Sequence, residues 1–333
     1  MSLRLLPADY VERVRFRWER ALEPHLQGYL LATSASDAAE LATALPLSEN
    51  SAPRLYRLSR EVASVLGCSR PFALFHTRAE KHLNAEVWLS KVPFAIRLIG
   101  SVASVLDDVA LKAMIGHEFG HYLAHGASAE PRSDVLRPHR LRSDHPLASA
   151  CSVAAELTAD RFALVACQEL EATVRLEVAS ATGERPEALG LRELDYLAEA
   201  CGLVDAGRVP LVEGTHPSRE FRLYAIWLFS LSDVYRSLTS AAGSELSLAT
   251  VDAQLTEMLL TPELESFLES PEHAREMAKR ARLDKLAAPV GSAPTSEVGV
   301  LSDLEARFRK LEADVSRADD LERRFRELER RGR

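Results

Sequence analysis

The feature that most constrains this chain is the pattern His-Glu-x-x-His, formed by His117, Glu118 and His121. Two histidines four residues apart on a helix lie one above the other on the same face. Both imidazoles can then reach one metal ion. Imidazole suits zinc, and a zinc site with three protein ligands leaves the fourth position for a water molecule. The pattern therefore predicts a zinc site held by His117 and His121, with Glu118 as the base that takes a proton from this water.

A pair of acidic residues further along the chain supports this interpretation. Glu156 and Asp160 are four residues apart in a segment whose apolar spacing predicts a helix at about 148–170. If this helix crosses the first one, Glu156 can supply a third ligand. Asp160 can hold a ligating imidazole from behind and so fix its tautomer and orientation. The same spacing also occurs on exposed acidic helix faces, but its place behind His-Glu-x-x-His favours one zinc ion per chain.

Composition limits the class of protein. With 333 residues, 47% of them hydrophobic, the chain can bury a large core, and its net charge of -8 argues against a general nucleic-acid binder. The four cysteines contain no C-x-x-C pair, so neither a thiolate zinc site nor a redox pair is indicated. The most apolar window, 92–106, is interrupted by Arg97 and is about 15 residues long, shorter than a membrane span of roughly 20. We expect a soluble cytoplasmic protein without membrane insertion.

Periodicity predicts an α+β fold that is mostly helical. Short apolar runs at 71–76, 83–89 and 94–99 are typical of strands. Asp107 or Asp108 is expected to cap the helix that carries the motif, which should continue to about 125. The segment 34–51 is interpreted as a short helix followed by a loop. The other expected helices lie at about 8–23, 53–66, 148–170, 192–201, 219–241, 246–260 and 262–286.

The chain divides by composition into an N-terminal helical segment at 1–50, a body at 51–286, a linker at 287–300 and an amphipathic or coiled-coil helix at 301–333. Self-association and docking on the catalytic body are equally compatible with this last helix, and a solvated helix without a partner is the simplest alternative. An arginine-rich polar loop is expected at 127–146.

Three segments occur in order: His117-Glu118-Phe119-Gly120-His121, then Glu156-x-x-x-Asp160, and finally Thr215-His216-Pro217-Ser218-Arg219-Glu220-Phe221-Arg222. Together they resemble the signatures of gluzincin metallopeptidases related to the CAAX prenyl protease and the heat-shock protease HtpX. The resemblance extends from about 53 to 240. It implies that residues 51–286 form a zincin-like metallopeptidase domain that contains one small sheet. It also implies that zinc is bound by His117, His121 and Glu156, and that Glu118 is the general base.

The resemblance also implies roles for four further residues. His216 and Arg222 would approach the site to stabilise an oxyanion. Asn84 and Ala85 would lie on an edge strand along which a substrate peptide extends, although an ordinary sheet strand explains these two residues equally well. The best-known relatives are built around transmembrane helices, and none is expected here, so the resemblance is to a member without them.

These observations predict a zinc-dependent endopeptidase that acts on peptides or proteins. The alternative is a metal-binding but proteolytically silent interaction protein, or an enzyme kept latent by its own C-terminal helix. The presence of Glu118 and of a third ligand argues against the silent protein, because a site without catalysis has no physical need for the base.

Overall fold

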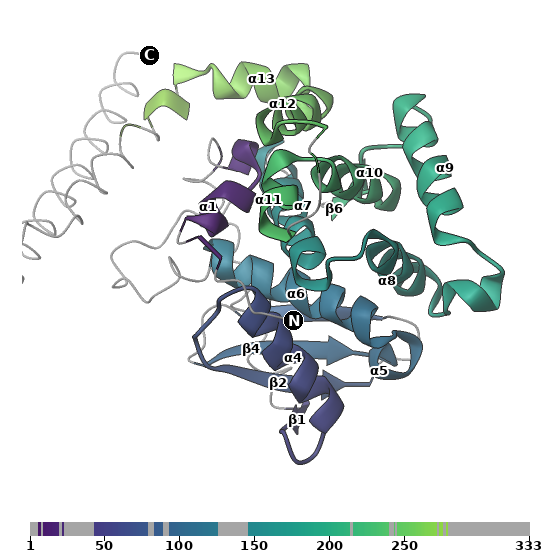
Figure 1. The fold of residues 1–333 in the computed structure, drawn as a ribbon. Helices are drawn as coiled ribbons and strands as arrows, with labels where there is room; N and C mark the ends of the chain where they lie inside the picture. The colour runs from purple at the N-terminus through teal and green to yellow at the C-terminus, as the bar shows by residue number, and fades with distance from the viewer. Residues whose placement is uncertain are drawn as a thin grey trace, which may run out of the picture. The chain divides into compact units, whose positions relative to one another are not determined.

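The computed structural model describes residues 6–7, 9–19, 22, 43–78, 83–88, 93–125, 146–213, 216–239, 243, 245–271, 273–275 and 278. Its elements form a mixed α and β fold that is mostly helical, which confirms the predicted class (Figure 1). All of these elements belong to one compact unit made of residues 1–132 and 137–277. The linker at 287–300, the helix at 301–333 and positions 127–145 of the predicted loop lie outside the described residues.

Four of the described strands form one sheet in the order β1-β2-β4-β3. They are β1 (Leu45–Leu47), β2 (Phe72–Thr77), β3 (Asn84–Trp88) and β4 (Phe94–Ile99). β2 and β4 are parallel, whereas β1 and β3 each pair with their neighbour in the antiparallel sense. The three predicted strands are confirmed, and β3 is an edge strand as the resemblance implied.

β1 corrects the loop that was predicted at the end of 34–51, whereas residues 34–42, where the short helix was expected, lie outside the described residues. Three residues are too few to show the alternation by which a strand is recognised. The strand is defined instead by its pairing with Leu74, Phe75 and His76 of β2. Pro46 at its centre is tolerated because β1 is the other edge of the sheet.

Helix α6 (Asp108–His125) carries the motif and packs on the sheet. Phe119 of α6 contacts the rings of Phe72 and Phe94, each at a centroid distance of 5.3 Å. Phe72 and Phe94 are register partners in the parallel strands, so both rings project from the same face of the sheet. Helix α4 (Pro53–Val65) contacts this face through Tyr56, whose ring centroid lies 5.8 Å from that of Phe72.

The remaining helices pack around α6 and one another, mostly on the side of α6 away from the sheet (Figure 1). No helix among the described residues is long and apolar enough to cross a membrane. The other described elements are α1 (Tyr10–Val14), α5 (Val102–Val105), α7 (Pro146–Cys167), α8 (Leu170–Thr182), η3 (Pro186–Leu189), α9 (Glu193–Asp205), β5 (Val212–Glu213), β6 (His216–Pro217), α10 (Arg219–Ser230), α11 (Asp233–Thr239), α12 (Leu248–Leu259) and α13 (Pro262–Leu268).

Several helix predictions were too long. The helix expected at 148–170 ends at Cys167, because Gln168 has a positive φ of 57°, and the unpredicted α8 follows it. The helix expected at 219–241 is interrupted between α10 and α11, where the backbone N–H of Asp233 donates to the carbonyl of Leu246. The helix expected from 262 ends first at Leu268, and helical residues occur again from 271.

The N-terminal segment also differs from its predicted continuous helix at 8–23. α1 ends at Val14, and Arg15 has an extended backbone. The N–H of Phe16 donates to the hydroxyl oxygen of Thr158 on α7 at 3.0 Å. Arg161 of α7 donates to the Val14 carbonyl at 3.2 Å. These bonds to α7 replace the helical hydrogen bonds at the break.

Helices α6 and α7 cross at very short range because α6 carries two glycines at the crossing. A Cβ atom at Gly116 would lie 2.5 Å from the Cβ of Ala166, and one at Gly120 would lie 2.7 Å from the Cβ of Phe162. A side chain at either position would therefore hold the helices apart. The crossing brings the motif on α6 next to the acidic pair on α7.

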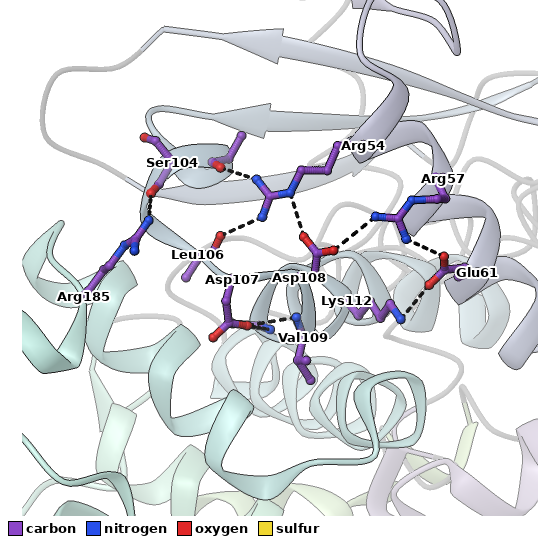
Figure 2. A network of polar contacts seen from close by, with 12 residues as sticks. Arg54, Arg57, Glu61, Ser104, Leu106, Asp107, Asp108, Val109, Lys112 and Arg185 are labelled. Carbon is purple, nitrogen blue, oxygen red and sulfur yellow. Dashed lines mark hydrogen bonds and ion pairs between the residues drawn. The ribbon is translucent and has the colours of Figure 1, made fainter. Parts of the chain in front are cut away.

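The start of α6 is fixed by the polar network in Figure 2. Asp107 caps the helix, since its Oδ1 accepts hydrogen bonds from the backbone N–H groups of Val109 at 2.9 Å and of Ala110 at 2.8 Å. Arg54 of α4 donates to Asp108 at 2.7 Å, and Arg57 lies 3.2 Å from the same carboxylate. Exposed pairs of this kind are each worth less than about 1 kcal/mol, but together they set where α6 begins.

Candidate metal centre

The crossing of α6 and α7 brings together His117, His121 and Glu156. The two histidine Nε2 atoms are 3.1 Å apart. Glu156 lies 3.3 Å from Nε2 of His117 and 3.5 Å from Nε2 of His121, with a different carboxylate oxygen facing each ring. The three side chains could hold a single metal ion. The three ligands predicted from the sequence thus meet at one point.

Asp160 lies one helical turn after Glu156, and its Oδ1 is 2.9 Å from Nδ1 of His117. Because a carboxylate accepts hydrogen bonds, Nδ1 carries the proton of this contact, and Nε2, which faces Glu156 and His121, is the nitrogen that would bind a metal ion in place of its own proton. Asp160 therefore lies behind the His117 imidazole, at the position that was predicted for it. It orients the ring and sets its tautomer.

In the candidate site, burial and neighbouring charges shift the pKa values of His117 and Glu156 in opposite directions. Burial alone would lower the pKa of His117, but the carboxylates of Asp160 and Glu156 raise this pKa to about 10. Burial would raise the pKa of Glu156, yet its contacts with both histidines hold that pKa well below its ordinary value. The carboxylates therefore favour a positive charge between His117 and Glu156, which a proton supplies in the metal-free protein and a bound cation could supply in its place.

Glu118 is buried, with 5% of its surface exposed. Burial is the main cause that raises the pKa of its carboxyl group, and the negative charges of Glu156 and Glu86 contribute, while the two motif histidines oppose the shift. A carboxylate with a raised pKa is a stronger proton acceptor than an exposed one. These surroundings suit a general base.

Arg222 of α10 lies behind Asp160. Its Nε donates to Oδ2 of Asp160 at 2.9 Å and its Nη2 donates to Oδ1 at 2.5 Å. Nη1 lies 3.1 Å from Oε1 of Glu177 on α8. The observed contacts of Arg222 are therefore those of a residue that orients Asp160. Its predicted contact with an oxyanion stays a prediction.

The other predicted site residues lie on elements next to the ligand helices. His216 is exposed on β6, which lies against α7. Asn84 is exposed and Ala85 is buried on the edge strand β3, which lies beside α6. Their roles toward an oxyanion and a substrate stay predictions.

Sequence reasoning missed two buried acids near the site. Glu177 sits between Val174 and Val178 on the buried side of α8. A charge within such an apolar helical stripe is the signal that could have identified it. Glu19, in the N-terminal segment, has Oε1 3.0 Å from Nε2 of His125 at the end of α6. No local pattern indicates the contact between Glu19 and His125, because the two residues are far apart in the sequence.

Comparison of the chain with family models, with curated proteins and with solved structures finds no match. A functional proposal for this protein therefore rests on its own residues. The residues that carry it are His117, His121 and Glu156, with Glu118 and Asp160 beside them.

Proposed function

We propose that this chain is a zinc-dependent endopeptidase that holds one zinc ion with His117, His121 and Glu156. The observation that carries the proposal is the spacing of the ligand atoms, which are 3.1, 3.3 and 3.5 Å apart. Atoms bound to zinc at about 2.0–2.1 Å in a tetrahedral site lie roughly 3.3–3.4 Å from one another. Two imidazoles and one carboxylate are also a zinc donor set, whereas calcium and magnesium prefer oxygen ligands.

A bound zinc ion lowers the pKa of a coordinated water to around 7 and polarises a carbonyl group. Glu118 would accept the proton of the attacking water and pass it to the nitrogen of the leaving amine. Its burial supports this role, since water that would compete for the carboxylate is largely excluded. Asp160 keeps the His117 ring in the orientation that binding requires.

The edge strand β3 supports a peptide as the substrate. An exposed strand edge presents unpaired backbone N–H and C=O groups, which an extended peptide can satisfy by adding as a further strand. Asn84 and Ala85 lie on this strand, and β3 runs beside α6. His216, exposed beside α7, is the proposed donor to the oxyanion. The three ordered motifs support membership of the gluzincin metallopeptidases related to HtpX and the CAAX prenyl protease.

The proposal is tested by incubating the full chain with unstructured peptides and denatured casein and by identifying the products by mass spectrometry. We expect cleavage that a chelator abolishes and that added zinc, but not magnesium, restores. Products should carry new amino and carboxyl termini from internal peptide bonds. Intact substrates after prolonged incubation with zinc-loaded protein, also with a variant that lacks residues 290–333, would instead favour the proteolytically silent metal-binding protein.

A further inference from the structure

We propose that Glu177 is a positioning residue of the metal centre, acting on His117 through Arg222 and Asp160. The inference rests on the proposed metal site but not on peptidase activity. The contacts form a continuous row across four helices. Oε1 of Glu177 on α8 lies 3.1 Å from Nη1 of Arg222 on α10, Nε of Arg222 lies 2.9 Å from Oδ2 of Asp160 on α7, and Oδ1 of Asp160 lies 2.9 Å from Nδ1 of His117 on α6.

The row is shielded from water along most of its length. The side chains of Asp160, Glu177 and His117 are 3%, 8% and 11% exposed, and that of Arg222 is 20% exposed. Hydrogen bonds between such buried groups are strong, and each group polarises the next. A change at the far end of the row can therefore reach His117 without any direct contact.

Glu177 controls how Arg222 acts on Asp160. A guanidinium is a planar fork, so holding Nη1 against Glu177 turns Nε and Nη2 toward the two oxygens of Asp160. Glu177 also attracts the positive charge of Arg222, which is then divided between Glu177 and Asp160. Without Glu177, Arg222 would attract the negative charge of Asp160 more strongly, and less of that charge would be available for the hydrogen bond to His117. Both effects of Glu177 strengthen the hold of Asp160 on the ligand.

The two histidine ligands depend unequally on this row. Nδ1 of His117 has Asp160 as its partner. Nδ1 of His121 is buried and has no hydrogen-bond partner among the described residues. Metal-binding histidines are usually oriented through their second nitrogen. Among the described residues, the row that ends at Glu177 thus orients His117, whereas no comparable row orients His121.

The test compares zinc dissociation constants of the full chain, measured by competition with a chromophoric chelator. Glu177→Gln keeps the side-chain shape and removes the charge. We expect its dissociation constant to rise by about 3–10-fold, less than the ~10–100-fold expected for Asp160→Asn. Asp252→Asn is the control. Asp252 is a buried carboxylate that pairs at 2.6 Å with Arg161, the residue after Asp160, so its loss should lower thermal stability without changing zinc affinity.

Two further variants separate the row from a direct effect of charge. In an Asp160→Asn background, Glu177→Gln should add less than about a twofold change, because the route to His117 is already broken. Arg222→Lys keeps the charge but loses the fork, and should weaken zinc binding on its own. It also serves as the test if Glu177→Gln fails to fold.

Wild-type affinity in Glu177→Gln or in Arg222→Lys would overturn the inference. An equal loss in both backgrounds would also overturn it, because the charge of Glu177 would then act directly through space. If wild-type protein binds no zinc, the proposed metal site fails, and the inference fails with it. Zinc binding by wild type with an unaffected Glu177→Gln would overturn this inference alone.

Discussion

Replacing Glu118 by glutamine should leave zinc bound and lower the rate of peptide hydrolysis by about 10²–10⁴-fold, the usual contribution of a general base. Glutamine has nearly the same shape as glutamate, so the buried surroundings of position 118 are preserved. Its amide cannot accept the proton of the attacking water. Zinc should stay because the proposed ligand atoms come from His117, His121 and Glu156 and not from position 118. Initial rates on one peptide and the metal content of the same preparation provide the measurement.

Glu61→Gln is the matched control for this substitution. Glu61 also contacts α6, through an ion pair of 2.6 Å with Lys112, but belongs to the network at the start of the helix (Figure 2). Its replacement should change the rate by less than about twofold, because an exposed pair contributes little. Cleavage by Glu118→Gln at the wild-type rate would exclude Glu118 as the base.

A second large effect is expected from Gly120→Ala. The new Cβ would lie 2.7 Å from the Cβ of Phe162 and 3.0 Å from the Cα of Ala159. The second of these atoms is backbone, so α6 and α7 must move apart. We expect a loss of about 1–3 kcal/mol in the free energy of unfolding, as for other overpacked cores. Zinc affinity should also fall, because the movement separates Glu156 from His121.

Gly202→Ala provides the control for Gly120→Ala. Gly202 lies inside α9, and a Cβ there would meet nothing within 4 Å. This change should be neutral or stabilise the protein by about 0.5–1 kcal/mol, because alanine is the better helix former. Urea unfolding midpoints at an unchanged m-value measure both effects. Equal stability and equal zinc affinity in the two variants would show that the close crossing does not hold the site together.

The members of the candidate metal site were predictable because their spacing is set by local helix geometry. His117 and His121 share a helix face whatever else the chain does, and the same holds for Glu156 and Asp160. That these two faces meet depends on the crossing of α6 and α7. The glycines that permit the crossing lie within and just before the motif, at Gly120 and Gly116.

Other parts of the fold were not predictable from local patterns. β1 is too short to have a period, and the hairpin of β5 and β6 pairs only two residues on each side. α8 begins directly after the break at Gln168; the helix predicted at 148–170 reaches only its first residue, and no element was predicted for the rest of it. Arg222 contacts Glu177, which comes from α8, through its Nη1 atom. Because α8 was not predicted, the row of Glu177, Arg222 and Asp160 behind His117 was not predicted either.

The zinc content of the purified full chain, measured beside that of Glu156→Ala, decides whether His117, His121 and Glu156 form a metal site. Metal content comes before activity because an inactive preparation could reflect an unsuitable substrate. We expect close to one zinc per chain in wild type and far less in Glu156→Ala, since two histidines alone leave the ion without its carboxylate ligand. Wild-type protein that takes up no metal when zinc is offered would contradict the site and, with it, the proposed peptidase.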